Sequence, residues 1–218
     1  MNKNKFGALA LMLALIAIMA AACGGGSKEK VISLGTTSSG SYTNDYFGVS
    51  LQFPSEWEAQ DMEMVNQLAE AGAELIAGDD EELQKGMDLS QAKTVNLLMA
   101  SKYPIDTADQ PNPSVILVGE KVSLLQGVKD GKDYLEASQE LMTQSGLPYE
   151  FQEIKEQQVG GKDFHVMEVA VNVSPELSIT QNYYSTILEG YAFNIITTHV
   201  DDETKAQVED IIQSVTFK

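Results

Sequence analysis

The feature that most constrains the fold is a series of four strand-like runs between residues 150 and 199. The runs cover residues 150–158, 163–173, 178–188 and 191–199, with Gly160-Gly161 and Glu189-Gly190 in two of the connections. Connections this short join antiparallel strands, and Gly adopts the positive φ that tight hairpin turns need. The pattern therefore predicts antiparallel hairpins in the second half of the chain.

Helical and strand patterns also flank this region. Asp130 is a candidate N-cap for a helix that runs to Ser145, and the acids at 201–203 begin a second helix that reaches Gln213. An earlier helical stripe consists of Met64, Val65, Leu68, Gly72, Leu75 and Ile76. Further strands are predicted at 49–53, 94–103, 115–122 and 215–217, and Trp57 is expected in the core. Together these elements predict a single α+β domain over residues 44–218, with helices packed on a central antiparallel sheet.

The charge of the chain is strongly acidic. It has 14 Lys+Arg against 32 Asp+Glu, and all the basic residues are Lys. Nucleic acid is a poor partner for such a chain, because cationic side chains supply most of the affinity for phosphate. A protein or cationic partner, or a neutral ligand, suits it better. The alternative is that the acids only keep the protein soluble.

The first 22 residues have the three-part layout of an export signal. Lys3 and Lys5 precede the apolar run 6–19, and Ala20-Ala21-Ala22 leads to Cys23, the only cysteine. Residues 20–23 resemble the lipobox of bacterial lipoproteins, although Ala20 stands where Leu is usual. The resemblance implies cleavage before Cys23, acylation of its thiol and anchoring at the extracytoplasmic face of the cell membrane. Residues 23–43, which begin with Gly24-Gly25-Gly26-Ser27, are predicted to be a flexible tether.

The beginning and end of the domain resemble Mog1/PsbP-like proteins. The first match is Phe47-Gly48 followed by a strand, Pro54 and Trp57; the second is the hairpin at 184–198 followed by an acid-capped helix and a final strand at 214–217. The resemblance covers residues 44–218 and implies an α/β/α sandwich. It transfers no functional residue, and residues 62–93 form an acidic helical insert that the shortest members lack.

No catalytic, cofactor-binding or metal-binding residue is assigned. His165 is expected at the rim of the buried sheet face, and His199 in a local pairing before Asp201. The pair lacks the spacing of a zinc site. Ser90-Gln91-Ala92-Lys93 matches the S-x-x-K motif, but its partner motifs are absent.

Three weaker site hypotheses remain. The runs 79–82 and 201–203 could bind Ca²⁺ through their carboxylates, although helix-start charge is the favoured role. Tyr183, Tyr184, Tyr191 and Phe193 could line a groove for a peptide or sugar, or pack across strands. We expect a non-enzymatic binding or accessory module, with a cell-surface hydrolase using acidic residues, or a weak Ca²⁺-binding protein, as alternatives.

Overall fold

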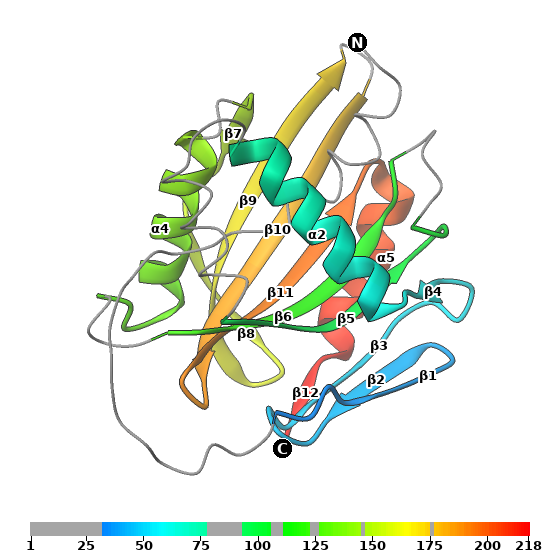
Figure 1. Cartoon of the computed structure of the whole chain (residues 1–218). Coiled ribbons are helices and arrows are strands. Elements are labelled where there is room, and N and C mark those ends of the chain that lie inside the picture. Colours follow the sequence, from blue (N-terminus) through cyan, green and yellow to red (C-terminus); the bar gives the residue numbers. More distant parts are fainter. Residues whose placement is uncertain (1–31, 78–92, 106–110, 123–126, 145–146, 175–176) are drawn as a thin grey trace.

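The protein is described by a computed structural model, which covers residues 32–77, 93–105, 111–122, 127–144, 147–174 and 177–218. In these ranges the chain forms two antiparallel sheets and three helices (Figure 1). The helices are α2 (Met62–Ala77), α4 (Gly131–Gln144) and α5 (Asp202–Ser214). The small sheet contains β1 (Thr36–Ser38), β2 (Ser41–Asn44), β3 (Val49–Gln52) and β12 (Thr216–Phe217). The large sheet contains β4 (Glu58–Ala59), β5 (Thr94–Ser101), β6 (Ser114–Lys121), β7 (Tyr149–Phe151), β8 (Lys155–Val159), β9 (Lys162–Ser174), β10 (Leu177–Leu188) and β11 (Tyr191–His199).

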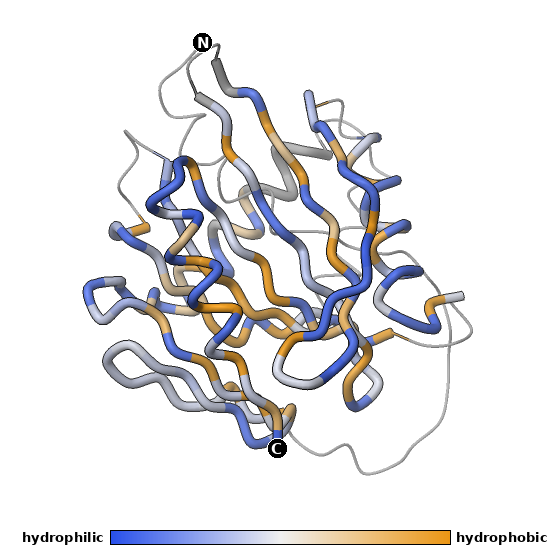
Figure 2. The backbone as a smooth tube through the Cα atoms, turned by 180° about the vertical axis from the view of Figure 1, so that it is seen from behind, coloured by the Kyte–Doolittle hydropathy of each residue, from blue (hydrophilic) through white to orange (hydrophobic). Residues whose placement is uncertain are grey.

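The predicted hairpins belong to the large sheet, whose strand order is β4-β5-β6-β11-β10-β9-β7, with β8 also paired to β9 at the edge. Glu189 and Gly190 have φ of 51° and 80°, and Gly160 and Gly161 have φ of 57° and 80°. Positive φ at both central residues is the signature of a two-residue hairpin turn whose twist matches that of the strands. The central strand β11 is buried at every position, and hydrophobic residues concentrate along the middle of the sheet (Figure 2).

Helices cover both faces of the large sheet, as the α/β/α prediction requires. The helices α2 and α4 pack on one face, where Val65, Leu135 and Met142 join a cluster with Met167 and Tyr183. The helix α5 and the small sheet cover the opposite face. Their core is formed by Tyr42, Phe47, Val49, Leu51, Trp57, Phe164, Phe193, Ile195, Val208, Ile211 and Ile212, among others. The α+β class with a central antiparallel sheet is therefore confirmed.

The predicted strand at 150–158 is wrong as a single element, because β7 and β8 occupy it. Both pair with β9, but Phe151 lies opposite Val169 and Lys155 opposite Val166, so four steps on one strand match three on the other. One extra residue in 152–154 makes this a bulge, which bends an edge strand. The backbone N–H of Gln152 donates to the carbonyl of Glu168 at 2.9 Å within the bulge.

The predicted tether at 23–43 is too long, because residues 36–43 belong to the folded domain. Tyr42 and Asn44 in β2 are both 1% exposed. The Tyr42 hydroxyl donates to the carbonyl of Leu34 at 2.7 Å, and the Asn44 amide donates to the carbonyl of Ser33 at 2.7 Å. Burial of the Tyr42 ring holds this polar segment in the small sheet. The leader, Cys23 and residues 24–31 lie outside the described residues.

The predicted helices form with small differences in which side chains they bury. The Asp130 side chain accepts from the N–H groups of Lys132 and Asp133 at 2.9 and 3.0 Å, so it caps α4 as expected. In α2, Val65 is buried, whereas Met64 is 43% exposed and does not belong to the buried stripe. Ala69 is buried instead, because it follows Val65 by one helical turn.

Candidate functional site

A polar groove lies between α5 and the strands β8, β9 and β10, with a volume of about 330 Å³. Its lining residues place it on the α5-covered face of the large sheet, next to the bulged edge. The groove is lined by Gln152, Glu153, Lys155, Gln157, Val166, Glu168, Asn182, Tyr184, Lys205, Val208 and Glu209.

The floor of the groove is set by strand alternation. Val166 lies opposite Tyr184 and Glu168 opposite Asn182 in the β9–β10 register. These four residues share the face covered by α5, whereas Met167, between Val166 and Glu168, packs on the face covered by α4. An apolar row and a polar row therefore lie side by side on the floor.

The two walls come from a helix and from an edge strand. Lys205, Val208 and Glu209 are three and four residues apart on α5, so they share one helical face. Lys155 in β8 lies opposite Val166 in β9, so the Lys155 side chain is on the same sheet face as the floor.

Five charged side chains surround the groove without pairing with one another: Glu153, Lys155, Glu168, Lys205 and Glu209. In the described part of the chain, none of these side chains makes an ion pair or a hydrogen bond within the protein. Their charges and hydrogen-bonding groups are therefore available to a ligand.

Tyr184 is the aromatic residue of the groove. Burial, together with the carboxylates of Glu209 and Glu168, raises the pKa of its hydroxyl to about 12. The phenol is therefore protonated at neutral pH and can donate a hydrogen bond. Glu168 on the sheet and Glu209 on the helix line the same groove as this phenol.

His199 is the last residue of β11 and lies opposite Thr180 of β10. Burial and the nearby Lys205 lower its pKa, although Glu168, Glu209 and Asp201 act in the opposite direction. Its Nδ1 atom is buried without a hydrogen-bond partner in the part of the chain that the structure describes. The neutral imidazole is thus the form that the fold favours.

The lowered pKa of His199 predicts a loss of stability in mild acid. The unfolded chain, in which His titrates near 6.5, binds a proton before the folded chain does. The free energy of unfolding should therefore fall as pH drops through that value, and level off below the folded-state pKa. Urea unfolding of His199→Asn at pH 7.5, 6.5 and 5.5 should show that its free energy of unfolding declines less steeply with falling pH than that of the wild type. An unchanged slope in the variant would contradict this assignment.

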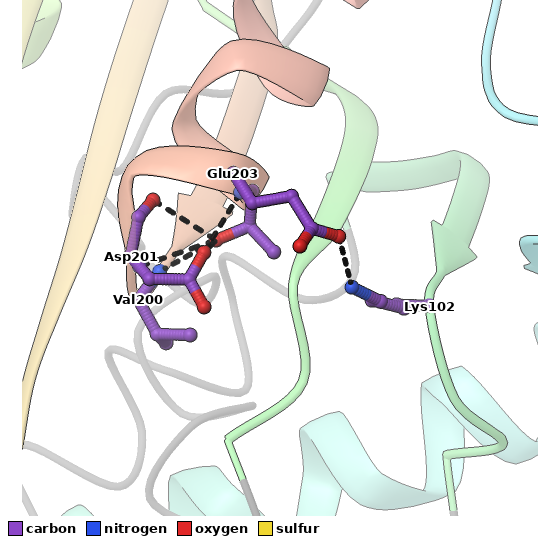
Figure 3. Close-up of polar contacts among 5 residues, drawn as sticks. Lys102, Val200, Asp201 and Glu203 are labelled. Atoms are coloured by element: carbon purple, nitrogen blue, oxygen red, sulfur yellow. Dashed lines mark hydrogen bonds and ion pairs between the residues drawn. The ribbon is translucent and has the colours of Figure 1, made fainter.

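The acids at 201–203 serve the start of α5, as the favoured interpretation predicts. The Asp201 side chain accepts from the N–H of Thr204 at 2.8 Å, and the Thr204 hydroxyl accepts from the N–H of Asp201 at 3.2 Å. Glu203 instead pairs with Lys102 at 3.0 Å (Figure 3). No group of three or more His, Cys, Asp or Glu residues that could hold a metal ion is found in the described ranges. The acidic run 79–82 lies outside them.

The predicted aromatic cluster does not form one groove. Tyr183 packs on the α4 side of the sheet, and Tyr191 and Phe193 lie in the core on the α5 side. The Tyr191 ring meets that of Phe47 edge-on, at 5.8 Å between centroids. Only Tyr184 of the four lines the groove.

The remaining sequence candidates do not contribute to the groove. His165 is half-buried on β9 and lies 3.8 Å from the carboxylate of Glu156. It sits at the rim of the sheet face that contains Met167 and Val169, as predicted. Of the S-x-x-K motif, only Lys93 is among the described residues, so the motif is not tested.

Sequence reasoning missed a second polar feature, a buried pair on the α4 side. The Tyr134 hydroxyl donates to Glu120 Oε2 at 2.9 Å, and both residues are buried. Burial, followed by the charge of Glu120, raises the pKa of Tyr134 well above its ordinary value. The signal in the sequence was a Glu that follows the apolar run Val115–Val118.

The groove residues Glu168, Asn182, Lys205 and Glu209 were also missed. Each reads as the solvent-facing side of a strand or helix, and no spacing links them in the sequence. Only the packing of α5 on the large sheet, beside β9 and β10, brings them to one place.

Comparisons with known proteins identify no family. No family model matches the chain, and no curated protein matches it. The solution structure of cyanobacterial PsbP (CyanoP) from Synechocystis sp. PCC 6803 is similar with a TM-score of 0.47 and 11% identity, over 88% of this chain and 98% of that one. The crystal structure of LpqN, involved in cell envelope biogenesis of Mycobacterium tuberculosis, is similar with a TM-score of 0.43 and 13% identity, over 78% of this chain and 83% of that one. In the described ranges, no helix combines the length and apolar character needed to span a membrane.

Proposed function

We propose that the chain is a lipid-anchored, extracytoplasmic binding or accessory module, and that the groove beside α5 is its ligand site. The observation that supports a binding role is the set of groove side chains whose charges and hydrogen-bonding groups are unused within the described protein. The anchor is inferred from the leader at 1–22 and from Cys23.

The tether places the domain near the membrane without burying it. Residues 24–31 precede the first described residue, and β1 begins at Thr36. After cleavage before Cys23, 12 Lys remain against 32 Asp+Glu, a net charge of −20. An anionic lipid surface repels such a domain, so two acyl chains, each CH₂ contributing about 0.8 kcal/mol, would provide the attachment.

The hydrolase alternative depends on the same groove. Glu168 on the sheet and Glu209 on the helix both line the groove with Tyr184. Hydrolysis of glycosides uses two carboxylates that face each other across the scissile bond. The five unpaired charges of mixed sign favour ligand binding over this chemistry, so binding is the function that we propose.

The anchor predicts a specific chemical modification. In cells fed an alkyne analogue of palmitate, the wild-type protein should take up the label, and its N-terminal peptide should begin with an acylated Cys23. Cys23→Ala should take up no label, because the thiol that accepts the lipid is missing.

Ser27→Ala is the matched control, since it lies in the same segment and keeps the cysteine. It should label like the wild type. A mature N-terminus at residue 23 without added acyl mass, or equal labelling of Cys23→Ala, would exclude the lipid anchor.

A further inference from the structure

The wall of the groove formed by β8 is an exposed sheet edge. Within the described residues β8 pairs only with β9, and its residues 155–158 are exposed. An edge strand directs the N–H and C=O groups of alternate residues away from its sheet, where they can pair with another strand. The bulge at 152–154 bends this edge beside the groove.

The opposite wall is the helical face of Lys205, Val208 and Glu209. A groove between an exposed strand edge and a helix fits an extended peptide, because the edge can bond its backbone while the groove receives alternate side chains. The β8 edge supplies the first of these interactions, and the floor of Val166, Glu168 and Tyr184 supplies the second.

Charge indicates which side chain the groove receives. Glu153, Glu168 and Glu209 outnumber Lys155 and Lys205, and none of the five is paired within the described ranges. The whole chain has a net charge of −18 and therefore attracts cationic segments over a distance. A long cationic side chain that enters between Glu168 and Glu209 would meet two carboxylates, which form strong charge-assisted hydrogen bonds with Lys or Arg.

We propose that an extended basic segment of a partner protein pairs with the free edge of β8 and inserts a Lys or Arg side chain between Glu168 and Glu209. This inference rests on the proposed binding role of the groove, but not on the lipid anchor. A saccharide is the less favoured ligand, because Tyr184 is only 7% exposed and offers no open ring face for a sugar to stack on.

The test uses the full chain, purified in a non-ionic detergent, and a fluorescein-labelled peptide of alternating Lys and Thr. Fluorescence anisotropy should show saturable binding that weakens with added salt. Loss of a charge from a partly desolvated contact should weaken binding about tenfold in either Glu168→Gln or Glu209→Gln. An alternating Glu-Thr peptide should not bind.

Two matched variants separate the groove from the general acidity of the protein. Asp210→Asn removes the charge of a residue that follows Glu209 in the chain but lines a different hollow of the surface. Glu156→Gln removes the charge of the residue that follows Lys155. Each should change the affinity less than twofold, well below the tenfold effect expected at the groove. Equal losses in these variants, no binding of the Lys-Thr peptide, or its displacement by a neutral oligosaccharide would overturn the proposal.

Backbone pairing is tested on the peptide, without altering the protein. Two peptides carry N-methyl groups on alternate residues, one on the even and one on the odd positions. Strand pairing requires that one of the two loses binding, because only alternate N–H groups face β8. Equal binding of both peptides would exclude β8 as the pairing edge. The acylation result at Cys23 is independent of these outcomes, so failure of the peptide site and failure of the anchor are distinguishable.

Discussion

Gly131→Ala should lower the free energy of unfolding by about 3 kcal/mol, a large effect for the addition of one methyl group. Gly131 is the first residue of α4, and a Cβ there would lie 2.0 Å from the carbonyl oxygen of Ser185 and 2.6 Å from its carbonyl carbon. Ser185 is in the middle of β10, which is paired on both sides, so its backbone cannot move away. The clash can therefore be relieved only if the start of α4, where Tyr134 and Leu135 are buried, is displaced.

The expected loss is the net result of two opposing effects. Ala is intrinsically better than Gly in a helix by about 1 kcal/mol, so a stabilising or neutral result would show that α4 shifts freely. Lys132→Ala is the matched control, because it changes the next residue of the same helix at an exposed position. Urea unfolding followed by circular dichroism should show a much smaller change in the control than in Gly131→Ala.

Phe193→Ala should lower the free energy of unfolding by about 4 kcal/mol. Phe193 is 0% exposed on β11, and its ring centroid lies 5.2 Å from that of Phe47 and 6.2 Å from that of Phe217. Phe47 precedes β3 and Phe217 is in β12, so this side chain connects the small sheet to the large one. Its loss leaves a cavity between the two sheets, with rings on either side that cannot close it.

Phe193→Leu keeps most of the apolar area and should cost about 1 kcal/mol. Phe151→Ala removes a ring of the same size from the short strand β7, where the side chain is half-buried, and should cost less than Phe193→Ala. Equal losses in Phe193→Ala and Phe151→Ala would show that the contact between the two sheets contributes little to stability.

Several elements of this fold were predictable from local sequence because local chemistry determines them. Gly160-Gly161 and Glu189-Gly190 form their hairpins through positive φ, which depends on the turn residues alone. Asp130 and Asp201 cap α4 and α5 through hydrogen bonds to N–H groups two or three residues away. Local alternation also predicted the strand at 49–53, in which Val49, Leu51 and Phe53 are buried.

Packing decided the features that depend on residues far apart in the chain. The polar segment around Tyr42 reads as a tether, but its strand is held by pairing with β3, which in turn pairs with β12 at the end of the chain. The break between β7 and β8 follows from their register against β9 and leaves no mark in the alternation of residues 150–158.

The sequence alone determined the α+β class, the hairpins, the helix caps and the acidic charge, because each depends on composition or on neighbours within a few residues. The groove was decided only by tertiary structure. Glu168 and Asn182 meet through strand register, and Glu209 joins them because the apolar face of α5 must cover Tyr184 and Ile195. Burial of that apolar face aligns the helix over the sheet, and the polar residues at its border become neighbours as a consequence.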